Sequence, residues 1–192
     1  MEILSDIVGV ISGSPQFRLT ESFDENAPLY HFYSQNDLSD DLAGMDSIDS
    51  DNKQLRTFDK VNRLLADDVV FSLISGTATI VRRFHNNYLY TQNYVKLIPG
   101  NRIDPKYLVY LLNIDKSIQK QFATGLQGSQ VLKYTLRQLK ELEIPQLPPI
   151  GRQRIIGDIY FRQLRLNALR SRSTESETIL LLKKLEEATK NE

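Results

Sequence analysis

The sequence predicts an α+β fold, with a mixed and mostly β domain over about residues 1–149 and a long helical arm over residues 150–192. Three observations support this prediction. Short apolar segments bounded by turn residues fill most of the first 100 positions. Prolines at positions 145, 148 and 149 then mark an extended joint. The segment 150–190 contains no proline and is rich in Arg, Leu, Glu and Lys, which favour helix.

Composition excludes several classes of protein. The chain has 192 residues, 41% of them hydrophobic, which is enough for a sizeable core. It has no cysteine, so a disulfide framework and a thiolate zinc site are excluded, and a reducing cytoplasm is the compartment that fits. No run of about 18 apolar residues is present, and the N-terminus lacks a basic segment followed by an apolar core. We therefore expect neither a membrane span nor a signal peptide.

Charge is distributed unevenly although the net charge is zero. Residues 1–60 hold 12 acidic and 4 basic side chains. Residues 61–140 hold 4 acidic and 11 basic ones, and residues 141–192 hold 8 acidic and 9 basic ones. The middle third is therefore the part of the chain where a polyanion is expected to bind. A dipolar surface without any partner is the alternative that charge alone leaves open.

Hydrophobic patterning places the elements of the domain. An apolar opening at positions 4–11 ends in the turn residues 12–15, and residues 36–52, rich in Asp and Ser, are expected to form a solvated loop. Tyr88, Tyr90 and Tyr94 alternate, which favours half-buried sheet residues over platforms for stacked bases. The expected strands are residues 28–33, 55–58, 69–74, 78–81 and 88–98.

Helices are expected in the second half of the chain. Asp104 followed by Pro105 is typical of a helix start, and Ile118 and Phe122 predict a second helix that ends before Gly125. Residues 126–133 are expected to be a turn, and Thr135 to cap a short helix over 135–141.

The arm has apolar residues at coiled-coil intervals. Its roughly 40 residues would extend about 60 Å as one helix, longer than a domain of this size needs for its own core. The polar segment 171–176 interrupts the repeat, so either two helical stretches or one helix with a weak middle is expected. The stripe needs a partner, unless the helix folds back on the domain. The residues expected at this interface are Ile155, Ile159, Leu166, Leu169, Leu181 and Leu185.

Several short motifs, in this order, resemble the DNA-specificity subunit of type I restriction–modification enzymes. The opening at Leu4 to Gly13, the Asp104–Leu108 helix start and the Gly128-Ser129 turn followed by Leu136 and Leu139 each match a few residues of that family. The other matching segments are Asp67 to Ser72 with Ser75-Gly76-Thr77, Gln92-Asn93, and Ile144 to Ile150 with Gln153 and Ile155. Together these motifs cover nearly the whole chain.

The resemblance implies a non-catalytic subunit. In this family a recognition domain contacts double-stranded DNA, and long helices hold two such domains apart and dock methyltransferase subunits. Full-length members have two domains and two helices, whereas this chain has one of each, which implies a half subunit that homodimerises through antiparallel helices and reads a palindromic bipartite site. Gly151-Arg152 also replaces the usual acidic residue before Gln153, which puts the geometry of the joint in question.

The residue types of the basic block agree with the implied function. Arg, Lys, Asn and Gln carry the donors and acceptors that match base edges and phosphates. Residues 82–87 are expected to form a polar hairpin tip, and residues 127–130 a second polar loop; ordinary solvated turns are the alternative. The residues expected at DNA are Ser75, Thr77, Arg82, Arg83, His85, Asn86, Asn87, Gln92, Asn93, Gln127, Ser129, Gln130 and Lys133.

No catalytic motif is present in the sequence. It contains no G-x-G-x-x-G, P-loop or G-x-S-x-G motif, and none of the Asn-Pro-Pro-Tyr type used by methyltransferases. With only two histidines and no cysteine, no metal site is expected. S-adenosylmethionine and ATP with Mg²⁺ are therefore expected only on partner subunits. A coiled-coil adaptor or silent specificity cassette without DNA binding stays open, a free-standing DNA-binding regulator is disfavoured by the long helix, and an enzyme ranks last.

Overall fold

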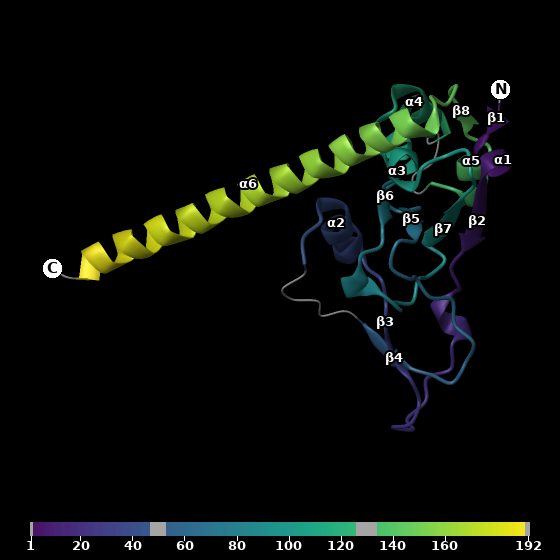
Figure 1. The fold of residues 1–192 in the computed structure, drawn as a ribbon. Helices are drawn as coiled ribbons and strands as arrows, with labels where there is room; N and C mark the ends of the chain where they lie inside the picture. Colours follow the sequence, from purple (N-terminus) through teal and green to yellow (C-terminus); the bar gives the residue numbers. More distant parts are fainter. Residues whose placement is uncertain (1, 47–52, 126–133, 191–192) are drawn as a thin grey trace.

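The sheet at the centre of the domain is antiparallel throughout (Figure 1). The computed structural model describes residues 2–46, 53–125 and 134–190. The sheet has the order β2–β7–β5–β6, and its strands are Val8–Ser12 (β2), Tyr94–Pro99 (β7), Val69–Ser72 (β5) and Ala78–Ile80 (β6). Two further antiparallel pairs flank it: Glu2–Ile3 (β1) with Glu143–Ile144 (β8), and Leu29–His31 (β3) with Gln54–Arg56 (β4).

The helices cover the sheet and extend beyond it. They are Leu4–Ile7 (α1), Gln35–Ala43 (α2), Pro105–Ile114 (α3), Lys116–Gly125 (α4), Leu136–Lys140 (α5) and Ile150–Lys190 (α6), with short 3₁₀ turns at Gln16–Arg18 and Arg83–His85. The α+β prediction is confirmed. The division into a domain over residues 1–149 and an arm over residues 150–192 stays a prediction. Helix α6 begins at Ile150, and its start packs on α3.

Local sequence signals explain where several helices begin. The carboxylate of Asp104 accepts hydrogen bonds from the backbone N–H groups of Lys106 (3.0 Å) and Tyr107 (3.2 Å), so α3 is capped as its Asp-Pro start predicted. The hydroxyl of Thr135 accepts from the Gln138 N–H group at 3.1 Å and caps α5 in the same way. Both helix starts expected from the sequence are therefore confirmed.

The main core lies between the sheet and α3. Val69, Phe71, Val95 and Leu97 of the central strands are buried against the apolar residues of α3 and α4. The side chain of Asn113 bonds both backbone groups of Ala78, at 2.8 Å to its N–H group and 2.9 Å to its carbonyl, and so fixes α3 on the edge strand β6. This core determines where the arm leaves the domain, because α3 is also the surface on which α6 packs.

The joint before α6 is held by one buried glutamine. The side-chain oxygen of Gln153 accepts from the Asp104 N–H group at 2.9 Å, and its amide nitrogen donates to the carbonyls of Arg102 (3.0 Å) and Pro148 (2.8 Å). Gly151 is exposed, and a Cβ atom there would meet nothing within 4 Å. The missing acidic residue therefore leaves the described joint intact.

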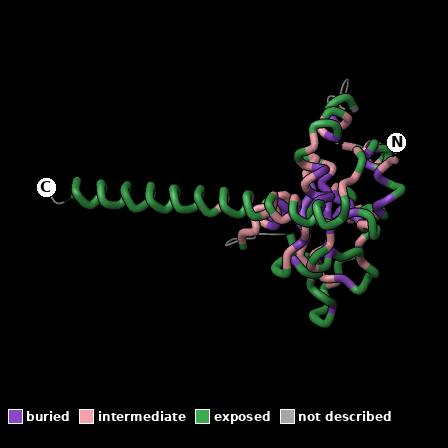
Figure 2. The backbone as a smooth tube through the Cα atoms, turned by 45° about the horizontal axis from the view of Figure 1, so that its top comes forward, coloured by how far each residue is buried: buried purple, intermediate pink, exposed green. Residues whose placement is uncertain are grey.

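Helix α6 has two differently supported halves (Figure 2). Up to about Ala168 it carries buried or half-buried positions that face the domain, including Gln153 and Gly157. Every residue from Leu169 to Lys190 is exposed. The helix is continuous through residues 171–176, so the expected interruption does not break it.

Two expectations about local structure were wrong. Residues 35–43 form α2, although 36–52 was expected to be a loop. The strand expected over 88–98 begins only at Tyr94, because Thr91–Tyr94 forms a turn closed by the Tyr94 N–H group on the Thr91 carbonyl at 2.9 Å. Tyr90 and Tyr94 are buried, and Tyr88 is half-buried and stacks on His31 outside any strand.

Candidate nucleic-acid interface

The polar residues expected at DNA gather at two ends of the central sheet. Ser75, Thr77, Gln92 and Asn93 lie at the end where the β5–β6 turn meets the start of β7, and we call them the turn-end cluster. The backbone N–H group of Leu73 donates to the Asn93 carbonyl at 2.8 Å, which joins the two segments. Residues far apart in the sequence are therefore brought to one edge, and Gly76 makes the turn possible with its positive φ of 67°.

A hollow of about 540 Å³ lies beside the turn-end cluster. Gln92 and Asn93 line it together with Gln16, Phe17 and Lys53. The side chain of Phe17 is 82% exposed. Amides, a cation and an exposed ring are the groups that read base edges, neutralise phosphates and contact bases. Sequence reasoning missed Gln16, Phe17 and Lys53 because they lie outside the basic middle block.

The second group of residues follows β6 at the opposite end of the sheet. We call Arg82, Arg83, Asn86 and Asn87 the loop cluster. Arg83 is exposed, and its side chain has no ion pair or hydrogen bond within the described ranges, so its guanidinium is available to a ligand. Arg82 is not equally free, because it donates to the Met45 carbonyl at 2.7 Å and pairs with Asp46 at 2.8 Å.

The two asparagines of the loop cluster are exposed. The amide oxygen of Asn86 accepts from the backbone N–H group of Ala66 at 3.0 Å, so its amide N–H groups remain to bind a ligand. Asn87 adopts a positive φ of 68°, a conformation that asparagine tolerates better than most residues. The loop contains a 3₁₀ turn rather than the hairpin tip that was expected.

His85 does not belong to this surface, and its assignment to DNA contact is corrected. Its side chain is fully buried, with Nδ1 2.8 Å from Asp41 Oδ1 and Nε2 3.1 Å from Asp37 Oδ1. Both carboxylates belong to α2. Sequence reasoning placed His85 at the surface because all its neighbours in 82–87 are polar or aromatic and α2 was not expected.

Helix α2 connects the two ends of the sheet. At its start, the Gln35 amide nitrogen donates to Ser72 Oγ (2.9 Å) and to the Tyr94 hydroxyl (2.7 Å). Burial raises the pKa of Tyr94 to about 12, so this hydroxyl stays neutral at physiological pH. Near its end, Asp41 accepts from the Arg82 backbone N–H group at 3.2 Å. Helix α2 is therefore hydrogen-bonded to the sheet beside both clusters.

A signal for α2 was present in the sequence. Ser34 Oγ accepts from the Asp37 N–H group at 3.2 Å while the Asp37 carboxylate accepts from the Ser34 N–H group at 2.7 Å, and Gly44 ends the helix with a φ of 66°. This reciprocal cap and glycine stop enclose nine residues. Apolar periodicity missed the helix because two of its buried positions are Asp37 and Asp41.

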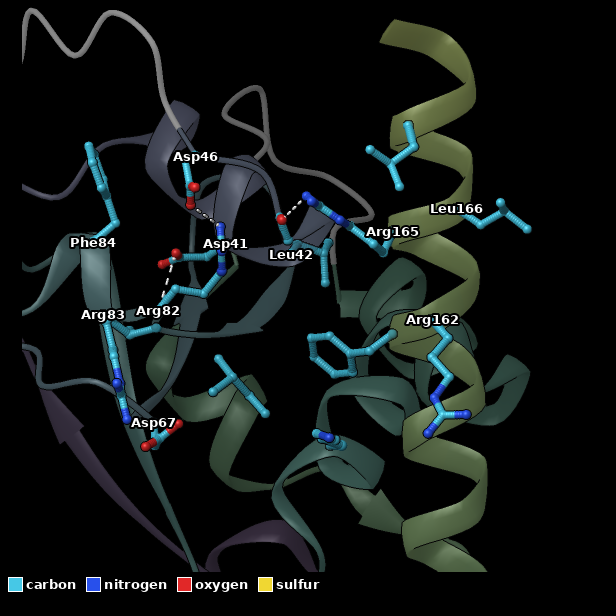
Figure 3. Close-up of a pocket in the computed structure, with 16 residues that line it drawn as sticks. Asp41, Leu42, Asp46, Asp67, Arg82, Arg83, Phe84, Arg162, Arg165 and Leu166 are labelled. Atoms are coloured by element: carbon cyan, nitrogen blue, oxygen red, sulfur yellow. Dashed lines mark hydrogen bonds and ion pairs between the residues drawn. The ribbon is translucent and has the colours of Figure 1, made fainter. Parts of the chain in front are cut away.

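A groove of about 980 Å³ lies between the loop cluster and the arm (Figure 3). Leu42, Ile80 and Phe161 contribute apolar surface to it. Arg82, Arg83 and Phe84 line it from the loop, and Arg162, Arg165 and Leu166 line it from α6. The arginines of the arm were not expected at a site, although residues 150–172 hold six arginines and a single acidic residue.

The expected interface residues of the arm are all exposed in the single chain. Leu166 and Leu169 line the groove, so the apolar stripe of the arm continues into it. Ile155, Ile159, Leu181 and Leu185 lie before and beyond it along the helix. An exposed apolar stripe of this length is typical of a surface that another molecule covers.

Part of the expected DNA surface cannot be placed. Gln127, Ser129, Gln130 and Lys133 lie outside the described residues. The next residue, Tyr134, donates its backbone N–H group to the Leu73 carbonyl at 2.8 Å, beside the turn-end cluster. Within the described part of the chain, no group of His, Asp and Glu side chains has the arrangement of a metal site, and no helix is long and apolar enough to cross a membrane.

Fold and site together define a small domain with polar and basic edges, packed on the start of a long helix that carries an exposed apolar stripe. A family model for the type I restriction modification DNA specificity domain matches residues 4–177, and the chain belongs to this family. Comparison with curated proteins gives no match.

Solved structures show the same fold. The chain is similar to the HsdS subunit from Thermoanaerobacter tengcongensis, with a TM-score of 0.60 and 19% identity over 97% of this chain and 42% of that one. It is also similar to a chain from a structure on the complex assembly and conformational transition of the type I R-M system, with a TM-score of 0.62, 20% identity and coverage of 97% and 43%. The chain therefore spans less than half the length of either structure.

Proposed function

We propose that this chain is a DNA-specificity subunit with one recognition domain, which directs methyltransferase and nuclease partners to a bipartite site and carries out no chemistry itself. The observation that carries the proposal is the rigid connection between a domain with polar clusters at its edges and an arm whose distal half touches nothing else in the described chain. Membership in the specificity family supports the same function. The proposal places the protein in the cytoplasm with its DNA.

The loop and turn-end clusters are the proposed DNA-reading surfaces. Arg83 offers a planar guanidinium that fits guanine or phosphate, and Asn86 and Asn87 offer amides that fit adenine. Gln92 and Lys53 add an amide and a cation at the other end of the sheet. Because α2 is bonded to both ends, the two clusters would meet a duplex as one rigid unit.

The arm is the proposed dimerisation and docking element. Residues 150–172 hold six arginines and one aspartate, whereas residues 173–190 hold four glutamates and three lysines. An antiparallel pair of arms would place the arginine-rich half of each beside the glutamate-bearing half of the other, whereas a parallel pair would place the two arginine-rich halves together. This charge pattern favours an antiparallel homodimer. The methyltransferase subunits would dock on the faces of the arms that remain uncovered.

Cofactor chemistry is assigned to the partners. S-adenosylmethionine and ATP with Mg²⁺ would bind to the methyltransferase and nuclease subunits, since the sequence contains none of the motifs that hold them. The role of this chain would be to bind DNA and to fix the distance between two half-sites.

Selection from a random duplex library tests the proposal. The chain would be purified alone and together with its methyltransferase subunit, and bound DNA would be sequenced. We expect two inverted half-sites at a fixed spacing, because a two-fold symmetric dimer reads a symmetric site. A single half-site would keep the recognition function and reject the symmetric dimer. No enrichment in either state, from folded protein, would favour the protein-only adaptor or silent cassette.

A further inference from the structure

A buried ionic cluster joins α2 to the loop that follows β6. His85 lies between Asp37 and Asp41, which are one turn apart on α2, at 3.1 Å and 2.8 Å. All three side chains are buried. Two carboxylates inside a protein are costly unless a cation or hydrogen-bond donors compensate them. Among the described residues, the imidazole of His85 is the one cationic group that pairs with both.

The geometry favours the charged form of His85, whose two ring nitrogens each face a carboxylate oxygen. A neutral imidazole carries one N–H group, so it can donate to only one of the two carboxylates, whereas the imidazolium can face both. Burial alone would lower the pKa of His85, but the contacts with Asp37 and Asp41 outweigh it and raise the pKa to about 9. The ring is also enclosed by the aromatic side chains of Tyr33, Phe84 and Tyr88.

Other bonds extend the cluster to the residues on either side. Asp41 accepts from the Tyr33 hydroxyl at 2.8 Å and from the Arg82 backbone N–H group at 3.2 Å. Asp37 accepts from the Ser34 N–H group and from the Ser34 hydroxyl, both at 2.7 Å. The loop is therefore bonded to the last turn of α2 through Arg82 and contacts the first turn through His85, while Ser34, the residue before the helix, holds the Asp37 carboxylate in place.

The loop itself has little regular structure to hold it. Its 3₁₀ turn is closed by the His85 N–H group on the Arg82 carbonyl at 3.0 Å, and it pairs with no strand. The end of the loop is held by backbone bonds from the Asn87 N–H group to the Leu64 carbonyl (2.8 Å) and from the Leu64 N–H group to the Tyr88 carbonyl (2.9 Å). Toward α2, the side chain of His85 is the group of the loop that reaches the buried carboxylates. Arg83 and Asn86 flank the segment that His85 anchors.

We propose that His85 is a positioning residue, whose buried imidazolium holds the loop cluster on α2 in the orientation from which Arg83, Asn86 and Asn87 contact DNA. This inference rests on the proposed function for its DNA part. His85 acts through the loop and touches no ligand. The groups that face it are Asp37 and Asp41 from α2, Tyr33 before α2, and Tyr88 after the loop.

The first test compares His85→Gln with His31→Gln. His31 is the matched control, because it is the other histidine of the chain, is half-buried and stacks on Tyr88 without an ion pair within the described residues. Amide hydrogen exchange would be followed along the chain. We expect His85→Gln to accelerate exchange of the amides of residues 82–88 and of the end of α2 by at least about tenfold relative to the control, with β5 and β7 unchanged. Equal exchange in both variants would overturn the inference.

The second test needs no variant of His85. The ring nitrogen shifts of His85 in the unmodified protein would be followed from pH 6 to 10 by NMR. We expect both ring nitrogens to carry protons at pH 7 and one to be lost near pH 9, and a neutral ring at pH 7 would overturn the inference. If His85→Gln does not fold, Asp37→Asn keeps the pair with Asp41, and we expect it to lower the pKa of His85 and to accelerate exchange in the loop.

DNA binding separates this inference from the proposed function. On the duplex that library selection provides, His85→Gln is expected to bind at least about tenfold more weakly than His31→Gln, because the contacts of the loop are no longer held in one orientation. If the unmodified protein binds a selected site and His85→Gln binds it equally well, His85 does not position the DNA-contacting residues. If the unmodified protein selects no DNA, the proposed function fails, and the DNA part of the inference is overturned with it, whatever the exchange data show.

Discussion

The two halves of α6 have the same secondary structure but different means of support. The first half is fixed by the three hydrogen bonds of Gln153 and by close packing of Gly157 on α3. Every residue of the second half, from Leu169 onward, is exposed, and Leu169 at its start lines the groove. In proteins most of the stability of a helix comes from packing of its apolar face. The first half has this packing on the domain, whereas the apolar face of the second half is exposed within the described chain. The difference shows that one continuous helix can be part of a core at one end and leave its apolar face exposed at the other.

The largest effect is expected from charges placed in the stripe of the arm. Leu166→Glu combined with Leu169→Glu should abolish the proposed dimer and reduce the helicity of the distal half, because carboxylates replace the apolar side chains that the partner would cover. Sedimentation velocity and far-ultraviolet circular dichroism would measure the two changes. Asn167→Glu, exposed between them, is the control. A dimer that survives the double substitution would place the interface elsewhere.

The packed half can be broken at one glycine. A Cβ atom on Gly157 would lie 2.6 Å from Lys106 Cβ and 2.8 Å from the Tyr107 backbone nitrogen, so Gly157→Ala should separate α6 from α3 and lower the free energy of unfolding by about 1–3 kcal/mol. Gly151→Ala is the matched control in the same helix. Since nothing lies within 4 Å of that position, it should stabilise the protein by up to about 1 kcal/mol. Urea unfolding would measure both, and equal effects would contradict the close packing.

The pH dependence of stability sharpens the comparison, because His85 belongs to the domain and not to the arm. Its pKa in the folded protein is about 9, above the ordinary value of 6.5. The stabilisation from His85 should therefore be complete below about pH 6.5 and be lost as pH rises through 9. The melting temperature should fall as pH rises over this range. In His85→Gln the fall of melting temperature with pH should be smaller, whereas in His31→Gln it should be the same as in the unmodified protein. If the unmodified protein and both variants show the same slope of melting temperature against pH, other titrating groups cause it.

The smallest effect is expected at the exposed end of the loop cluster. Arg83→Gln should weaken DNA binding and reduce the slope of log affinity against log salt by about 0.9, the value for one phosphate contact. Arg82→Gln should act differently, because Arg82 is bonded to Met45 and Asp46. Arg82→Gln should make the loop less ordered and should change the slope of log affinity against log salt less than Arg83→Gln does. Binding titrations at several salt concentrations would check both, and an unchanged slope for Arg83→Gln would remove it from the DNA surface.

Local signals were enough for the elements whose cause is local. The Asp104–Pro105 start of α3, the Thr135 cap, the apolar strands β5 and β6 and the arm after the prolines were all predicted from neighbouring residues. The arm is continuous through 171–176, where the polar residues were expected to weaken it. The hydroxyls of Thr174 and Ser176 bond carbonyls of the preceding turn, so they are satisfied within the helix.

Tertiary contacts decided the features that have no local cause. Residues 35–43 are poor in apolar side chains, and they form α2 with Asp37 and Asp41 facing inward because His85, 44 residues beyond Asp41, meets them in the core. Because of the same contact, His85 is a buried cation and not the DNA contact that was expected. Sequence patterns report which residues prefer water or the interior, but they do not report which distant charge will neutralise a buried one.

The sequence by itself therefore determined the α+β class, the Pro-rich joint, the long arm and the family resemblance, since each depends on short-range propensity or on residues in order along the chain. The tertiary structure alone decided which polar residues share an edge, that Arg83 is free while Arg82 is held, and that the groove joins the loop cluster to the arm. The physical reason is that surface exposure and ion pairing depend on contacts between segments whose separation in the sequence carries no information about their distance in space.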